Sequence, residues 1–237
     1  MKLPFVNRRS RRHGQSFIEL MLVMMILALL LTGVVEFGFL LNAYLHVLDG
    51  AREGARLGSN GIPFNPATST LYTNFYANVI KRTLDVMDPV ILDASHPDAS
   101  HQMDDVVVSV WSVTSTALIR FPSTEAGYSM CGNLGTLLAY YNAQVPPDVP
   151  APLTDPSWSS CSPRASNFST AQMTTLRDPL APSTGILLVE VFYNYPQVLK
   201  LPIFENSVYS VMPDPIPVYI YAIMPISAAE PTPTPVP

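Results

Sequence analysis

The chain has 237 residues, which leaves room for one or two domains, and its formal net charge is −5. Hydrophobic residues make up 48% of it, which is ordinary for a globular protein and does not indicate disorder. With 24 prolines and only 13% charged residues, the composition argues against a helical enzyme, and its acidity argues against a nucleic-acid partner.

Positive charge is concentrated at the beginning of the chain. Five basic residues precede Gly14: Lys2, Arg8, Arg9, Arg11 and Arg12. From Leu57 onward, six Lys or Arg residues stand against fourteen Asp or Glu residues, a surplus of eight negative charges. The positive-inside rule therefore predicts a cytoplasmic leader at residues 1–14 and an extracytoplasmic remainder.

Residues 15–59 are predicted to form one long helix, because this stretch has no proline and many good helix formers. Such a helix would be ~66 Å long at 1.5 Å per residue. Its apolar run from Leu20 to Val35 is long enough to enter a bilayer, and Glu36 would lie near the outer boundary of the hydrocarbon core. Residues 17–35 are therefore expected to cross the membrane.

One carboxylate, Glu19, lies just inside the edge of this apolar segment. An acidic side chain at that depth is costly unless a partner neutralises it. An uncleaved membrane anchor explains the predicted orientation but not the combination of Gly14 and Glu19.

After Glu36 the helix is expected to become amphipathic and to lay its apolar face on a domain or on sister helices. That face is formed by Phe37, Leu40, Leu41, Tyr44, Leu48, Ala51 and Ala55, and the polar face by Asn42, His46, Asp49 and Glu53. Gly50, Gly54 and Gly58 recur every fourth residue. They either permit the close approach of another helix or loosen this helix before a turn, and the sequence does not distinguish the two alternatives.

Three segments carry a resemblance to a known family: Gly14–Glu19 (GQSFIE), Gly33–Gly38 (GVVEFG) and Ala51–Arg56 (AREGAR). In this order and spacing they resemble the TadE-like family, pilin-like proteins of the tight-adherence (Tad/Flp) pilus systems. The resemblance covers roughly a quarter of the chain. It implies cleavage between Gly14 and Gln15 by a prepilin peptidase, so that the new α-ammonium group neutralises Glu19.

The resemblance also implies a structural role as a pseudopilin or minor pilin, without catalysis or cofactors. The implied partners are the lipid bilayer, the prepilin peptidase, other pilin-like subunits and Tad platform proteins. The implied location is the bacterial inner (cytoplasmic) membrane, crossed once. The residues implied in helix packing and assembly are Gly33, Glu36, Phe37, Gly38, Gly50, Ala51, Arg52, Glu53, Gly54, Ala55 and Arg56. The alternative is a bitopic extracytoplasmic binding protein with an uncleaved N-terminal anchor.

The remainder, residues 60–229, is predicted to be an extracytoplasmic α+β domain. A helix is expected over residues 71–87, ended by Asp88-Pro89. Strands are expected over residues 104–113, 117–121, 185–195 and 218–224. Because no helices alternate with these strands, they are predicted to form an antiparallel sheet that the long N-terminal helix covers on one face.

A long irregular loop, rich in Pro, Ser, Thr and Asn, is expected over residues 122–182. It contains Cys131 and Cys161, which are either two separate thiols or, as we expect, one disulfide that stabilises by ~3 kcal/mol. The Pro/Thr-rich tail, residues 230–237, favours an extended conformation.

Histidines and carboxylates crowd the segment before the first strand: Asp93, His96, Asp98, His101, Asp104 and Asp105. Such side chains could hold a divalent metal ion, but the spacing is not that of a zinc site. No metal site is predicted, and no phosphate-binding loop or nucleophile motif occurs.

Overall fold

The computed structural model describes residues 13–65, 68, 70–93, 97, 102–113, 117–124, 126–144, 158, 161–176, 184–199 and 214–229. Residues 1–12 of the expected leader, all of the expected tail, and His96, Asp98 and His101 lie outside them. The chain divides into two compact units, Met1–Leu41 and Asn42–Pro237. The second is called the sheet domain below.

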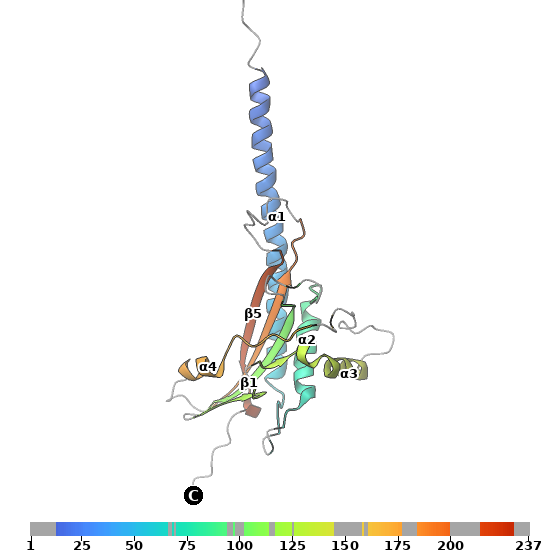
Figure 1. Ribbon diagram of the computed structural model, residues 1–237, viewed down its shortest axis with the longest axis vertical. Coiled ribbons are helices and arrows are strands. Elements are labelled where there is room, and N and C mark those ends of the chain that lie inside the picture. Colours follow the sequence, from blue (N-terminus) through green and yellow to red (C-terminus); the bar gives the residue numbers. More distant parts are fainter. Residues whose placement is uncertain are drawn as a thin grey trace, which may run out of the picture. The chain divides into compact units, whose positions relative to one another are not determined.

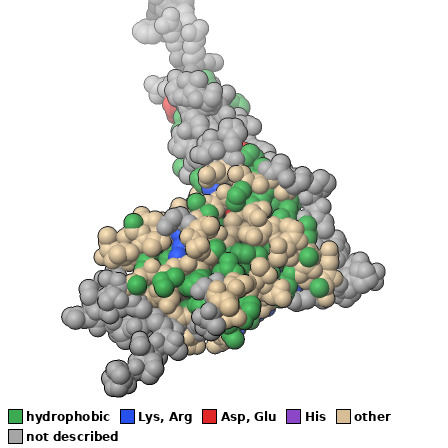
Figure 2. Space-filling view, turned by 60° about the horizontal axis from the view of Figure 1, so that its bottom comes forward, with side chains coloured by type: hydrophobic (Ala, Val, Ile, Leu, Met, Phe, Trp, Pro, Cys, Tyr) green, Lys and Arg blue, Asp and Glu red, His purple; other side chains and the backbone are tan. Residues whose placement is uncertain are grey.

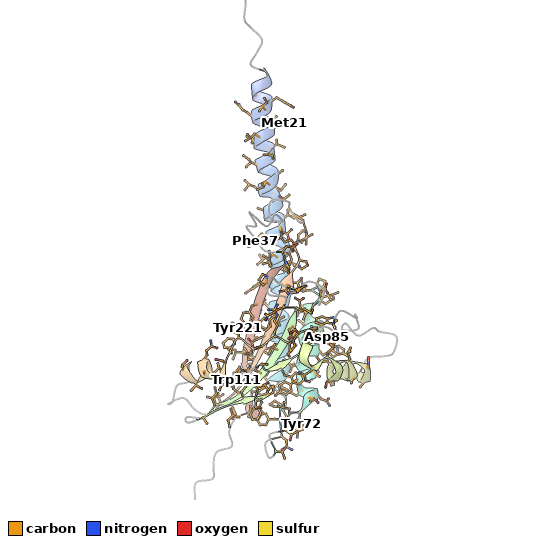
Figure 3. All side chains as sticks on the ribbon, in the orientation of Figure 1. Met21, Phe37, Tyr72, Asp85, Trp111 and Tyr221 are labelled. Atoms are coloured by element: carbon orange, nitrogen blue, oxygen red, sulfur yellow. A yellow bond between two sulfur atoms is a disulfide. The ribbon has the colours of Figure 1, made fainter. Side chains whose placement is uncertain are left out.

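The first unit contains the N-terminal part of α1 (His13–Gly58), a continuous helix of 46 residues. This part carries large apolar side chains on all sides, and no residue of its most apolar 18-residue stretch is buried. Figure 3 shows Met21 and Phe37 among the side chains that project from it. The helix is long and apolar enough to cross a membrane.

The sheet domain is built on an antiparallel sheet with the strand order β2-β1-β4-β5 (Figure 1). The strands are β1 (Asp105–Val113), β2 (Leu118–Phe121), β4 (Thr184–Tyr195) and β5 (Ile216–Pro225). The short β3 (Tyr128–Ser129) pairs with β1 beside β2. These strands confirm the predicted antiparallel α+β fold, because chain segments rich in β-branched and aromatic residues follow one another without crossover helices.

One face of the sheet, the helix-covered face, is apolar. Its central residues are all buried: Val106, Val108 and Val110 of β1, and Leu187, Val189 and Val191 of β4. The C-terminal part of α1 and α2 (Thr73–Met87) cover this face. Phe64 stacks on Phe121 with ring centroids 3.9 Å apart, and Tyr76 of α2 stacks on Tyr128 at 4.7 Å. Aromatic and aliphatic side chains thus form a continuous core on this side.

Alternate residues point to the opposite side, the polar face. It contains Asp105 and Ser109 of β1, Glu190 and Asn194 of β4, and Arg120 of β2. All five are buried. The pairing register puts Val107 opposite Glu190 and Trp111 opposite Arg120. The segment 161–176, which includes α4 (Thr170–Leu176), covers part of this face.

The stretch expected to be one irregular loop contains regular structure. Besides β3 and α4, it forms α3 (Leu134–Gln144), preceded by the 3-10 turn η1 (Cys131–Asn133). Leu137 and Tyr141, four residues apart, are buried, and α3 contacts α2. These two apolar anchors explain why a helix forms inside a stretch whose overall composition is that of a loop.

Candidate assembly site

The expected processing residues lie in the first two turns of α1, which begins at His13. The side chain of Gln15 lies outside the part of the chain that the structure describes. Glu19 is exposed and follows Gln15 by four residues, which is ~6 Å along the helix axis. An α-ammonium group at Gln15 would therefore be within about one turn of the Glu19 carboxylate.

The two glycines of the GVVEFG segment have free space where a side chain would begin. A Cβ atom added at Gly33 or Gly38 would meet no atom of the described residues within 4 Å. Phe37 beside them is exposed, and Glu36 is half-buried. This segment therefore leaves space for lipid or for another chain directly against the helix backbone.

The three glycines of α1 that lie in the sheet domain, Gly50, Gly54 and Gly58, have no space for a side chain, mainly because α2 packs against them. A Cβ atom at Gly50 would lie 2.8 Å from the carbonyl oxygen of Thr83, and one at Gly54 would collide with the Thr83 side chain. At Gly58 it would lie 2.8 Å from Val79 and 2.5 Å from Leu187. Glycines four residues apart on α1 thus face α2 residues at matching spacing, and close helix approach occurs inside the chain.

The hydroxyl of Thr83 is fully buried at this helix contact. It donates a hydrogen bond to the carbonyl oxygen of Val79 in its own helix, 2.9 Å away. A buried hydroxyl without such a partner would cost ~1–3 kcal/mol. Thr83 can therefore lie against Gly54 without demanding a polar group from α1.

The predicted apolar face of α1 is displaced in the sheet domain. Tyr44, expected to be on the packed face, is exposed, whereas Ala51 and Ala55 are buried as expected. The buried residues are the smaller ones: Ala43, Val47, Gly50, Ala51, Gly54, Ala55 and Gly58. Size decides the outcome, because α2 approaches too closely to admit tyrosine or leucine between the helices.

The charged residues of the AREGAR segment differ in whether they form ion pairs. Glu53 pairs with Arg56 in its own helix and with Arg82 of α2, each at 2.7 Å. Glu53 therefore joins α1 to α2 beside the glycine contact. Arg52 is exposed and forms no ion pair within the described ranges.

A groove runs between α1, α2 and the edge strand β5, with a volume of about 630 Å³. Its apolar lining includes Leu48 of α1, Val86 of α2, and Ile223 and Met224 of β5. Its charged lining consists of Asp49, Arg52, Glu53, Arg56 and Arg82. We call it the β5 groove.

On the polar face, Asp105 holds both ends of the segment 131–161, which begins and ends with a cysteine and which we call the excursion. Its carboxylate accepts hydrogen bonds from Ser129 Oγ (2.6 Å), from the Cys131 backbone N–H (3.1 Å) and from the Arg164 backbone N–H (2.9 Å). A disulfide joins Cys131 to Cys161, with Cα atoms 5.6 Å apart. Asp105 and the disulfide together form what we call the excursion clasp.

Asp104 and Arg164 extend this network. Asp104 accepts hydrogen bonds from the backbone N–H groups of Asn194 (2.7 Å) and Asp93 (2.9 Å). The guanidinium of Arg164 donates to the carbonyl oxygen of Met103 (2.6 Å) and to Gln102 Oε1 (2.8 Å). These bonds hold the segment before β1 against β4 and against the end of the excursion.

Burial raises the pKa values of the carboxyl groups on this side of the domain. The pKa of Asp104 rises to about 7 and that of Asp105 to about 6, because desolvation disfavours the charged forms. Burial also raises the pKa of Glu190, which accepts hydrogen bonds from the Asn167 N–H (2.9 Å) and from the Tyr219 hydroxyl (2.8 Å). Asp105 and Glu190 therefore make the polar face sensitive to protonation, and Asp104 does the same at the start of β1.

This arrangement assigns structural roles to two residues of the histidine- and carboxylate-rich segment, Asp104 and Asp105. Their oxygens are occupied by backbone and hydroxyl donors. Among the residues that the structure describes, no group of three or more His, Cys, Asp or Glu side chains could hold a metal ion.

Sequence reasoning missed Thr83, Arg82 and Arg164 as contributors to these contacts. For the helix contact a signal was available, because Val79, Thr83 and Met87 repeat the spacing of Gly50, Gly54 and Gly58. For Arg164 no local signal existed, since its partner Asp105 lies 59 residues earlier in the chain.

Comparison with known proteins matches one family model to the chain, described as TadE-like protein, over residues 14–56. The match confirms the TadE-like resemblance and covers all three motif segments. No curated protein and no solved structure gives a significant match. The matched segment begins beside the expected cleavage site and ends within the α1–α2 contact.

Proposed function

We propose that this chain is a membrane-anchored, pilin-like structural component of a Tad-type pilus or related secretion assembly. The observation that carries the proposal is the coincidence of the TadE-like match over residues 14–56 with a single uninterrupted helix over the same residues. The role is structural and involves no catalysis.

In this proposal the chain is stored in the inner membrane with its basic leader in the cytoplasm and the sheet domain outside. A prepilin peptidase cuts between Gly14 and Gln15. The new α-ammonium group then neutralises Glu19, in its own or a neighbouring chain, which makes a carboxylate tolerable in the apolar segment. Proteolysis thereby creates the ion pair that assembly requires.

The contacts along α1 support different roles for its two parts. α2 already packs against Gly50, Gly54 and Gly58 of α1, so these glycines are not available to sister helices. The segment around Gly33 and Gly38 has open backbone. We therefore assign assembly with other pilin-like subunits and with Tad platform proteins to the part of α1 before Asn42, where lipid and neighbouring helices compete for the same surface.

Mass spectrometry of the protein purified from a host with an active prepilin peptidase tests the proposal. The expected mature chain begins at Gln15, and a Gly14→Ala or peptidase-deficient control keeps the leader. A chain that still begins at Met1 in the competent host would contradict the pilin-like role and favour a bitopic binding protein with an uncleaved anchor.

Glu19→Ala provides a second test, with Asp49→Ala as a control, because Asp49 is an exposed acidic residue of the same helix outside the apolar segment. Under the proposal, Glu19→Ala impairs assembly with other subunits while membrane insertion and the fold of the sheet domain stay intact. If the protein only tethers a binding domain, Glu19→Ala is harmless or favours insertion, since it removes a charge from the apolar segment.

A further inference from the structure

The sheet has one long edge that no described residue pairs with. β5 is the last strand in the order, and Figure 1 shows it (red) at the border of the sheet. Its side chains Tyr219, Tyr221 and Ile223 are 36%, 48% and 46% exposed. The opposite edge, β2, has four residues and contacts α4. A ten-residue apolar edge strand is a template for pairing with another chain.

The β5 groove lies directly beside this edge. Residues Tyr221–Met224 of β5 form one wall, and α1 and α2 form the other. A strand added to β5 would send every second side chain toward this groove, because side chains alternate between the two faces of a sheet. Leu48, Val86 and Met224 offer apolar contacts there. On the face that Figure 2 shows, hydrophobic side chains lie among uncharged atoms, and few charged groups are visible.

The charge of the groove is opposite to that of its surroundings. Three arginines line it against two acidic residues, whereas the chain from Leu57 onward has a surplus of eight negative charges. Glu53 is already committed to Arg56 and Arg82. Arg52 has no ion-pair partner in the described part of the chain and is exposed to the groove. The groove lining thus has one more arginine than carboxylates, and Arg52 is the arginine that no described carboxylate pairs with.

We propose that β5 and the β5 groove bind an extended peptide segment of a partner protein by strand addition. The segment carries apolar side chains at alternate positions and a carboxylate that pairs with Arg52. Its backbone hydrogen-bonds to β5, its apolar side chains contact Leu48, Val86 and Met224, and the carboxylate sets its register. The inference goes beyond the proposed function and does not depend on cleavage after Gly14.

Selection from a phage-displayed library of random nonapeptides, against the full chain in lipid nanodiscs, tests this proposal. The wild-type chain is expected to enrich peptides with alternating apolar residues and an Asp or Glu. Arg52→Glu should shift the enrichment to Lys or Arg, and Arg52→Lys should restore the acidic preference. Enrichment no greater than on empty nanodiscs, or an acidic preference that Arg52→Glu leaves unchanged, would overturn the proposal.

Two further measurements locate the binding. A selected peptide should bind Arg52→Glu about fivefold more weakly than the wild type, and N-methylation of its alternate amides should abolish binding by removing the strand hydrogen bonds. Ile223→Lys on β5 should weaken binding, whereas Ile119→Lys on β2, which is similarly exposed, should not. Dimerisation of the wild-type chain that Ile223→Lys abolishes would assign the edge to a second copy instead and overturn the proposal.

Discussion

On its helix-covered face the sheet meets α1 and α2 through apolar side chains and Gly58, whereas on its polar face it meets residues 161–176 through buried carboxylates and arginines. The first contact depends on shape, which pH does not change. The second depends on charged and hydrogen-bonded groups, whose free energy changes with protonation. The contacts on the two faces of one sheet are therefore expected to lose stability under different conditions.

Removal of the disulfide should have the largest effect, and it acts on the polar face. Cys131→Ala with Cys161→Ala releases a constraint between residues 30 apart, which is expected to lower the free energy of unfolding by ~3–4 kcal/mol. Denaturant unfolding of the full chain in detergent measures the change. An unchanged midpoint would show that Asp105 alone holds the excursion.

Gly54→Leu tests the helix-covered face in the same assay. Its side chain has no room against Thr83 and the Val79 carbonyl, so the free energy of unfolding should fall by ~3 kcal/mol, equally at pH 5 and pH 8. Gly38→Leu is the matched control and should leave the stability of the sheet domain unchanged, because a Cβ atom there has no described atom within 4 Å. Equal losses in both variants would contradict the distinction between closed and open glycines.

The pH dependence of stability sharpens the comparison. The pKa values of Asp105 (about 6) and Asp104 (about 7) lie above the ordinary value of 3.8, so between pH 4 and 7 the folded state binds more protons than the unfolded state. Stability should therefore be greatest near pH 4 and fall as pH rises through 6 to 7, by at most ~1.4 kcal/mol per pH unit for each group.

Asp105→Asn should flatten this slope between pH 4 and 6, because it removes one of the titrating groups. It should also cost ~1–2 kcal/mol by leaving a backbone N–H of the clasp without its acceptor. Urea unfolding over a pH series measures both effects. A slope identical to that of the wild type would assign the pH dependence to Asp104 and Glu190.

Glu53→Gln should have the smallest effect. It removes the ion pairs with Arg56 and Arg82 beside the glycine contact, but these pairs are partly exposed and screened by salt. The loss of stability should be small at low ionic strength and should vanish in 1 M NaCl. A loss that persists in high salt would show that Glu53 acts through packing rather than charge.

The helix-covered face could be predicted from the sequence because its signal is local. Runs such as Val106–Val110 indicate strands, and the apolar spacing of residues 71–87 indicates the helix that became α2. Periodicity could not show which face of α1 packs, because the contact selects small residues over large ones. The size of the residue matters there more than its hydrophobicity.

The polar face could not be predicted, because its partners are distant in the chain. Glu190 interrupts an apolar strand and, read locally, predicts a solvent-facing position. It is buried because Asn167 and Tyr219, 23 and 29 residues away, donate hydrogen bonds to it. Only the three-dimensional pairing of segments identifies such groups.

The excursion clasp has a consequence for how such proteins diversify. Asp105 and the disulfide fix the chain at Cys131, Cys161 and Arg164, so the attachment of these three residues to β1 does not depend on how many residues join Cys131 to Cys161. Each doubling of a loop costs only ~0.6 kcal/mol in closure entropy. Insertions and exchanges of sequence at this place are therefore cheap, and a lineage can vary them while it keeps the same scaffold.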